Sequence, residues 1–175
     1  MLPLLIGLLA PTPIATAEAG LGAAVCGARG DVDCQRATTG VAFDLRGAWH
    51  PAPWIGLGAG VLYASLPADG TDAGTLWAVG PEITLLAHLT PTFRLLGAAM
   101  VGFDRIAGTG GSQTGWGALG LRLGARRQLT HGLDLGLDYG LLRPRLDELC
   151  EAGTCGQVEA ALVHRFSLVV GVSFW

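Results

Sequence analysis

The sequence predicts an all-β protein, an eight-stranded antiparallel up-and-down transmembrane β-barrel. Three observations predict it. Large apolar residues recur at every second position in segments of about ten residues, which is the length that a tilted strand needs to cross a bilayer. The connections between these segments alternate between short and long. Half of the 175 residues are hydrophobic and only 14% are charged, which is apolar for a soluble domain.

Composition limits the classes of partner. The net charge is −3 at pH 7, the basic residues are all arginine, and they form no basic run, so we expect no nucleic-acid binding. The 28 glycines favour strands over helices, because glycine weakens helix interiors and lets backbones approach closely.

Residues 1–19 are predicted to be a secretory signal peptide, and residues 20–175 the barrel domain. A short apolar run precedes small residues, with Ala-x-Ala ending at Ala17 and again at Ala19, so cleavage is expected after one of them. The run is too short to span a membrane as a helical anchor. Residues 18–27 are the only segment available as a first strand that would make the strand count even.

Seven further strands follow from the alternation. Residues 40–50 place Phe43 and Leu45 on one face, with Asp44 and Arg46 on the other. The most regular segment, residues 133–142, sets leucines and one tyrosine against aspartates and glycines. The last segment ends the chain on alternating apolar residues, including Phe174. The seven strands are expected at residues 40–50, 54–64, 76–89, 93–104, 117–126, 133–142 and 157–175.

Two residues interrupt the pattern. Trp116 is out of phase with the apolar face of its strand, which predicts a bulge or a rim position there. Pro81 lies on the apolar face in the middle of a strand, where it cannot donate a ladder hydrogen bond, so a bulge is expected there as well.

The connections give the topology. Those at residues 50–54, 89–92 and 129–132 are short, and those at residues 66–75, 104–115 and 143–156 are long. Tight turns on the periplasmic side and longer loops on the outer side are typical of membrane barrels.

Charged residues share the face opposite the apolar one. They are balanced in sign, and charges enclosed in a narrow lumen are tolerated when they are paired and hydrogen-bonded. The sequence therefore predicts a lumen plugged by carboxylate–arginine pairs, with Arg165 near the outer end. The predicted network consists of Asp44, Arg46, Glu82, Arg94, Arg122, Arg126, Asp134 and Asp138.

Aromatic residues fall at both ends of the strands, as expected for rings that lie at the two membrane interfaces. The expected periplasmic belt consists of Trp49, Trp54, Phe93, Phe174 and Trp175. The expected outer belt consists of Tyr63, Trp77, Phe103 and Tyr139.

Four cysteines form two local pairs in sequence, Cys26 with Cys34 and Cys150 with Cys155. An even count in an exported chain predicts disulfides, and we expect local pairing among the three connectivities. The spacing does not fit a zinc site, so no metal and no cofactor are expected.

A soluble β-sandwich also alternates and is the main structural alternative. It is disfavoured because the polar face is narrow and rich in glycine, whereas the apolar face is continuous on all seven strands. A transmembrane helix within residues 51–68 is disfavoured by three prolines and three glycines.

Together the signal peptide, the alternating strands, the connection lengths and the terminal aromatic strand resemble the small outer-membrane β-barrels of Gram-negative bacteria, of the OmpA-transmembrane-domain and OmpX type. The resemblance implies an outer-membrane location and contact with outer-membrane lipids and lipopolysaccharide. It also implies a monomer whose last strand is recognised by the barrel assembly machinery. Family members usually have the final aromatic in phase with the apolar face, whereas Trp175 is one residue out of phase.

The expected function is non-enzymatic, either structural or binding through the loops. Eight strands enclose an interior just wide enough for side chains, so a gated proton or small-ion path is the lesser interpretation of the lumen. Adhesion through Arg29-Gly30-Asp31 is a further, weaker one. The alternative from another class is an outer-leaflet lipid A-modifying enzyme, a deacylase or acyltransferase, although strand parity places His164 and Ser167 on opposite faces. Its candidate residues are His164, Ser167, Asp104, Ser112 and Glu159.

Overall fold

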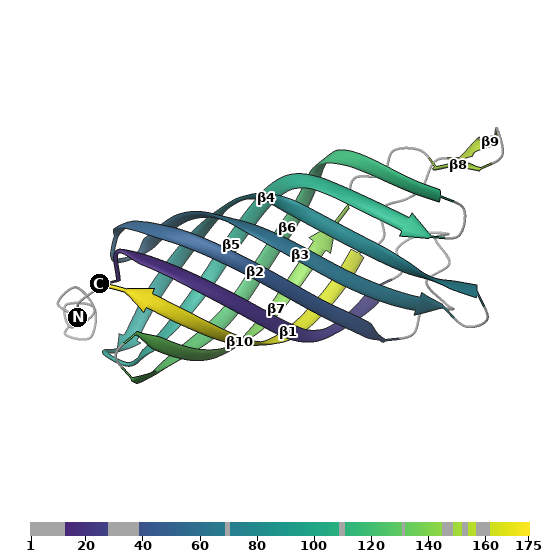
Figure 1. The fold of residues 1–175 in the computed structure, drawn as a ribbon. Coiled ribbons are helices and arrows are strands. Elements are labelled where there is room, and N and C mark those ends of the chain that lie inside the picture. The colour runs from purple at the N-terminus through teal and green to yellow at the C-terminus, as the bar shows by residue number, and fades with distance from the viewer. Residues whose placement is uncertain are drawn as a thin grey trace.

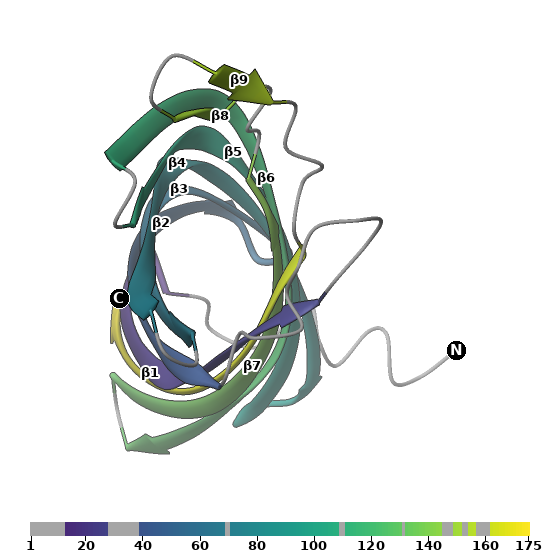
Figure 2. The ribbon, with the colours of Figure 1, turned by 90° about the vertical axis from the view of Figure 1, so that its right-hand side faces the viewer.

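Eight antiparallel strands close a barrel in the order β1-β10-β7-β6-β5-β4-β3-β2, so the predicted fold class is confirmed (Figures 1 and 2). The computed structural model describes residues 13–27, 39–68, 71–108, 111–130, 132–144, 149–151, 154–156 and 162–175. The barrel strands are β1 (Ala15–Gly27), β2 (Gly40–Ala52), β3 (Ile55–Ala68), β4 (Thr71–Thr90), β5 (Phe93–Gly108), β6 (Gly111–Thr130), β7 (Leu133–Arg143) and β10 (Leu162–Phe174). Two short strands, β8 (Leu149–Glu151) and β9 (Thr154–Gly156), form a separate hairpin at the end of the barrel opposite the termini.

The barrel is closed by pairing between the first and last strands. β1 pairs with β10 along its whole length, from Ala15 opposite Phe174 to Gly27 opposite Leu162. β1 therefore begins before the predicted first strand, and Ala15–Ala19 of the predicted signal peptide lie within it. Closure leaves neither strand with an unpaired edge.

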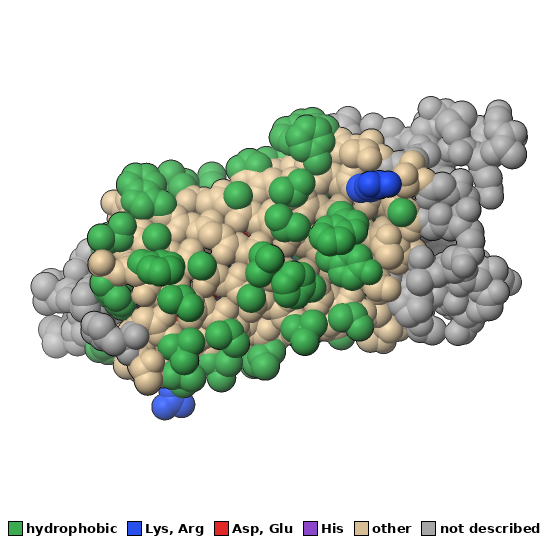
Figure 3. Space-filling model, viewed as in Figure 1, with side chains coloured by type: hydrophobic (Ala, Val, Ile, Leu, Met, Phe, Trp, Pro, Cys, Tyr) green, Lys and Arg blue, Asp and Glu red, His purple; other side chains and the backbone are tan. Residues whose placement is uncertain are grey.

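The alternation separates an apolar outside from a polar inside. Leu121, Leu135 and Val170 expose 59%, 38% and 47% of their surface, so they do not pack against a second layer of the protein. A β-sandwich would bury these side chains, and the soluble alternative is therefore excluded. Green apolar side chains are spread over the barrel surface, and blue arginines appear toward its two ends (Figure 3).

The strands continue past the expected apolar segments at the far end from the termini. β5 and β6 stay paired as far as Gly108 opposite Gly111, although residues 104–115 read as a long loop. β3 and β4 likewise stay paired to Ala68 opposite Thr71, within the expected loop of residues 66–75. Beyond the membrane neither strand face has to be apolar, so the period-two signal disappears although backbone pairing continues.

Of the two possibilities predicted at Trp116, a bulge or a rim position, the structure shows the bulge. Phe103 pairs with Trp116 and Gly102 with Ala118, which leaves Gly117 as the extra residue. Gly117 has φ of 107°, a left-handed conformation that glycine adopts without the steric cost of a Cβ. The bulge keeps Trp116 outward and restores the phase for Leu119 and the rest of β6.

The bulge expected at Pro81 was a wrong prediction. The β4–β5 ladder lacks pairs between Val79–Phe103 and Glu82–Met100, but the register is the same on both sides of this gap. Pro81 faces outward and pairs with Ala59 on its other side. Only the hydrogen bonding is interrupted, because proline has no N–H to donate toward β5.

The half of the interior farther from the termini has an apolar core. Its buried members, half of them alanines, come from every barrel strand. They are Ala24, Ala42, Leu62, Ala64, Leu76, Ala78, Met100, Ala118, Leu142 and Val163. Within the described ranges, no helix is long and apolar enough to cross a membrane.

Candidate functional site in the barrel interior

The centre of the lumen is organised around Arg126 of β6, whose side chain is fully buried. Its Nε donates to Glu18 Oε1 at 2.8 Å, and its Nη2 donates to Glu18 Oε2 at 2.9 Å. Its Nη1 and Nη2 also donate to Asp138 Oδ1 and Oδ2, at 2.5 and 3.0 Å. One guanidinium therefore binds two carboxylates, from β1 and β7, with its planar donors facing both.

Arg122 extends the network one step farther along β6. It donates to Glu18 and Asp138, each at 3.0 Å, and to Glu82 Oε1 at 2.7 Å. Glu82 also accepts from Thr84 Oγ1 at 3.3 Å. Arg122 thereby connects three strands across the lumen.

Arg46 of β2, on the wall opposite β6, and Arg165 of β10 complete the network. Arg46 contacts Asp44 on its own strand, Glu82 with 3.3 Å between Nε and Oε2, and Asp138 at 3.6 Å. Arg165 of β10 donates to Asp44 Oδ2 at 2.8 Å. We call the eight connected residues the central ion network: Glu18, Asp44, Arg46, Glu82, Arg122, Arg126, Asp138 and Arg165.

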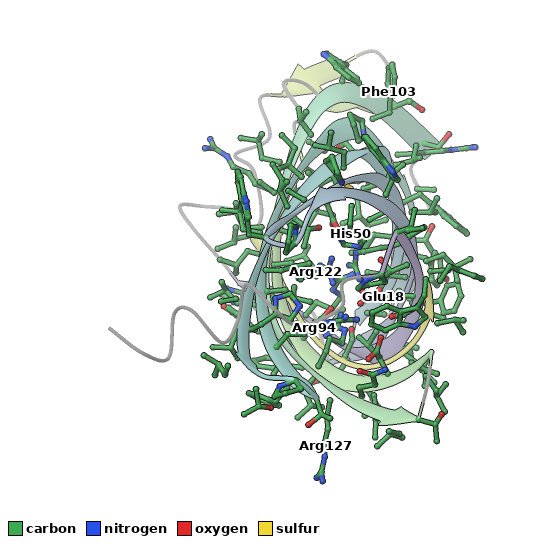
Figure 4. The ribbon with its side chains drawn as sticks, turned by 90° about the vertical axis from the view of Figure 1, so that its left-hand side faces the viewer. Glu18, His50, Arg94, Phe103, Arg122 and Arg127 are labelled. Atoms are coloured by element: carbon green, nitrogen blue, oxygen red, sulfur yellow. The ribbon has the colours of Figure 1, made fainter. Side chains whose placement is uncertain are left out.

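The central ion network holds four carboxylates and four arginines from six strands, so its formal charges cancel. Charges buried in a narrow lumen lose most of their hydration, and mutual pairing is what offsets that cost. Glu18 and Arg122 lie inside the barrel wall, whereas Arg127 points away from it (Figure 4).

A second, smaller cluster lies toward the end that carries the termini. Arg94 donates to Asp134 Oδ2 at 2.6 Å, and Ser173 Oγ donates to the same oxygen, also at 2.6 Å. Nearby, His50 Nε2 lies 3.1 Å from Thr16 Oγ1. Within the described residues, these groups form no hydrogen bond or ion pair with the central network, so the lumen contains two separate polar layers beside its apolar half.

Glycines opposite the charges make room for them. A Cβ at Gly20 would lie 2.7 Å from the Asp44 carboxylate, and one at Gly140 would lie 2.7 Å from Arg165 Nη2. A Cβ at Gly124 would collide with Asp138, its cross-strand partner. The inward glycines and the large charged side chains are therefore complementary in volume.

Little space remains between the layers. A cavity of about 20 Å³ lies between the central network and the apolar half, bordered by Arg46, Glu82, Arg122, Met100 and Leu142. A second cavity of about 20 Å³ lies on the other side of the network, beside His50 and Arg94. Each has room for about one water molecule.

All eight predicted lumen residues face inward, but the structure divides them. Six of them belong to the central ion network, while Arg94 and Asp134 form the separate cluster. Sequence reasoning missed Glu18 because it lies between two candidate cleavage sites, and it placed Arg165 only near the rim. The alternation of Glu18 with Ala17 and Ala19 was the signal that could have found it.

The predicted aromatic residues lie on the outside of the barrel. Phe103, labelled in Figure 4, projects outward, and its ring packs 4.4 Å from that of Trp116. Tyr63 and Trp77 form a similar pair at 4.7 Å between centroids, and Tyr139 packs 4.9 Å from Phe166. The other predicted members, Trp49, Trp54, Phe174 and Trp175, are exposed, and Phe93 is half-buried.

The candidate catalytic residues are not brought together. Ser167 is buried inside the barrel, 3.5 Å from Asp44, whereas the His164 ring lies outside and is hydrogen-bonded to Tyr139 at 2.7 Å. Asp104 is buried inside, Ser112 accepts from Arg105 at 3.2 Å, and Glu159 lies outside the described residues.

The cysteines are described in part. The backbone register of the β8–β9 hairpin sets Cys150 directly opposite Cys155, and Cys26 lies near the end of β1. Cys34 and Arg29-Gly30-Asp31 lie outside the described residues. In the part of the chain that the structure covers, no three His, Cys, Asp or Glu side chains are grouped to hold a metal ion.

Comparison with known proteins identifies the fold. No family model matches the sequence, and no curated protein matches it. Neisserial surface protein A matches with a TM-score of 0.64 and 14% identity, over 91% of this chain and 97% of that one. Ail of Yersinia pestis matches with a TM-score of 0.58 and 11% identity, over 94% of this chain and 100% of that one. The outer-membrane enzyme PagL matches with a TM-score of 0.50 and 14% identity, over 91% of this chain and 99% of that one.

These matches agree with the features of this chain. Its barrel is closed, its outer surface is apolar, and its charged side chains are gathered inside. A closed sheet with this distribution satisfies its backbone hydrogen bonds within a bilayer. The protein is a membrane β-barrel with the closed eight-stranded fold of the small outer-membrane barrels of Gram-negative bacteria.

Proposed function

We propose that this barrel is a non-enzymatic, non-conducting outer-membrane protein whose interior serves stability and whose outer hairpins serve binding. The observation that carries the proposal is the central ion network. Its side chains come from six of the eight strands and meet in the middle of the lumen. A plug of this kind replaces water as the partner of each buried charge.

Two further features support a closed lumen. The apolar half lies in series with the network, and an ion crossing it would exchange its hydration for mainly apolar side chains around Asp104. The cavities on the two sides of the network are each the size of one water molecule.

Planar-bilayer recording of the refolded protein tests this proposal. We expect no stepwise conductance from the wild-type protein over a range of voltages. Removal of Glu82 and Arg122 together, as the double alanine variant, should open a small leak because two side chains that cross the lumen are lost. Regular ion-sized steps from the wild-type protein would contradict a plugged lumen.

The outer-leaflet enzyme is the second candidate, since the enzyme PagL shares the fold. A hydrolase of the Ser–His type needs both groups within hydrogen-bond reach, whereas the barrel wall separates Ser167 from His164. We expect lipid A recovered after incubation of the refolded protein with lipopolysaccharide to keep its mass. If the wild-type protein removes or transfers an acyl chain and Ser167→Ala still does so, the active site lies elsewhere. If Ser167→Ala has lost this activity, Ser167 belongs to the active site.

Binding through the outer end is the remaining part of the proposal. β3–β4 and β5–β6 continue as paired hairpins past the membrane, and β8–β9 forms another hairpin at that end. Ail, which has the same fold, has been solved in complex with the heparin analogue sucrose octasulfate. We expect the folded protein to bind a ligand only while these hairpins are intact. Protease shaving of whole cells, which cuts exposed hairpins, followed by a binding measurement on the immobilised protein tests this expectation.

Assembly and oligomeric state belong to the same proposal. We expect the barrel assembly machinery to recognise β10, whose outward residues end on Phe174, and the folded protein to be a monomer. Phe174→Ala should lower the amount of folded protein in outer membranes, and light scattering in detergent should give one chain per micelle.

A further inference from the structure

A polar cluster on the outside of the barrel is used by neither the lumen nor the proposed binding loops. Tyr139 Oη and His164 Nδ1 are 2.7 Å apart, and both side chains belong to the outward faces of adjacent strands, β7 and β10. Arg143, also outward and exposed, lies two residues beyond Leu141, which is the cross-strand partner of His164. Arg143 is thus the diagonal neighbour of His164, within reach of a long side chain.

The height of this cluster matches a membrane interface. Phe174 is near the end of the barrel that carries the termini, and His164 lies ten residues away from it along β10. At a rise of about 3.3 Å per residue and a tilt of about 40°, ten residues climb about 25 Å, which equals the apolar band of an outer-membrane barrel. With the short turns on the periplasmic side, the cluster lies at the outer-leaflet headgroups and Arg143 lies just above the hydrocarbon.

The outward charges have one sign. Among residues whose side chains are described, every acidic group faces the lumen, and the outward-facing charges are Arg105, Arg127 and Arg143. An anion at the cluster would therefore meet a guanidinium and an imidazole, and no Asp or Glu side chain that the structure describes shares the outer face with them. The hydrogen bond to Tyr139 occupies His164 Nδ1, and no described residue hydrogen-bonds its Nε2.

We propose that Arg143, His164 and Tyr139 form a binding site for a phosphate group of outer-leaflet lipid A. Arg143 supplies paired donors to phosphate oxygens, and His164 supplies Nε2–H as a further donor. Tyr139 holds the imidazole in place, and its ring packs against Phe166 at 4.9 Å. The site lies in the membrane surface and is independent of whether the lumen is plugged.

Native mass spectrometry of the folded protein with added diphosphoryl lipid A tests the proposal. We expect the wild-type protein to retain this lipid about tenfold more tightly than chemically dephosphorylated lipid A, since charge-assisted hydrogen bonds to one phosphate are lost. Arg143→Gln and His164→Ala should each remove most of this preference, and Tyr139→Phe should weaken it. Arg127→Gln is the matched control, because Arg127 is also outward and exposed but pairs with Phe93 at the opposite end of the barrel.

Two arms make the result decisive. Heat-modifiable gel mobility identifies variants that have folded, and the ring ¹⁵N signals of His164 report on the site without any substitution. Those signals should shift in nanodiscs containing lipid A and should not shift with inorganic phosphate alone. Equal retention of phosphorylated and dephosphorylated lipid A, an effect of Arg127→Gln as large as that of Arg143→Gln, or an equal shift with inorganic phosphate would overturn the proposal.

Discussion

Arg126 and Asp138 are joined by two parallel hydrogen bonds, of 2.5 and 3.0 Å, between β6 and β7 in the middle of the barrel. The same guanidinium binds Glu18 of β1, so it links the first strand to two strands on another part of the wall. Each charge in this arrangement depends on its partners, because the side chains are buried and have lost most of their hydration.

Removal of Arg126 should therefore be costly. Arg126→Met leaves Glu18 and Asp138 buried with fewer partners, and we expect a loss of about 3–5 kcal/mol in the free energy of unfolding. Arg127→Met is the control, since the neighbouring side chain is exposed on the outside and should change stability by less than about 0.5 kcal/mol. Urea unfolding in lipid vesicles measures the unfolding free energy of both variants. Equal losses would show that the central ion network does not contribute to stability.

The inward glycines should be sensitive to the smallest side chain. Gly124→Ala drives a methyl group against Asp138, so we expect a loss of about 1–3 kcal/mol in unfolding free energy. Gly97→Ala is the matched outward substitution, because a Cβ there would have Leu123 Cδ2 as its nearest contact, at an ordinary 3.6 Å. A larger loss at Gly97 than at Gly124 would contradict the proposed complementarity between glycines and charges.

Substitution of Pro81 should restore the β4–β5 ladder. In Pro81→Val the new N–H faces β5 in an unchanged register, so the amide of Val at this position should be strongly protected from hydrogen exchange. The net change in stability should stay below about 1 kcal/mol, because the added hydrogen bond is offset by greater freedom of the unfolded chain. Rapid exchange of this amide would indicate a locally distorted ladder.

The mature N-terminus should retain Glu18. This residue makes ion pairs with both Arg122 and Arg126, so cleavage after Ala17 keeps the central ion network intact, and cleavage after Ala19 removes a quarter of its carboxylates. Intact mass measurement of protein isolated from outer membranes distinguishes the two sites. A mature chain that begins at Gly20 would show that the barrel is stable without this carboxylate.

Cys150 and Cys155 should form a disulfide within the β8–β9 hairpin, because they are directly opposed in register. Peptide mapping under non-reducing conditions should recover them as one linked pair. Replacement of both by serine should leave the unfolding of the barrel unchanged, since β8 and β9 form a separate sheet. A link from either cysteine to Cys26 or Cys34 would contradict local pairing.

In the candidate site, the alternation of residues along each strand predicted which side chains face the lumen but not which of them pair. Asp44, Arg122 and Asp138 could be assigned to the lumen because each alternates with large apolar neighbours on its own strand. Their partners could not be assigned in this way, since Arg126 and Glu18 are 108 residues apart in sequence. Which carboxylate meets which arginine depends on the register around the whole barrel and on its tilt.

The strands show the same division. The sequence by itself determined that the chain would form outward-apolar strands and that hydrocarbon would cover them, because a period of two is a local property of each segment. One tryptophan out of phase, Trp116, also indicated a bulge or a rim position, and the structure shows a bulge with Gly117 as the extra residue. Only the tertiary structure decided where β1 begins, how far the hairpins extend beyond the membrane, and how four carboxylates and four arginines are shared among six strands. These outcomes depend on backbone pairing and on closure between distant segments, and neither produces a periodic pattern in the sequence.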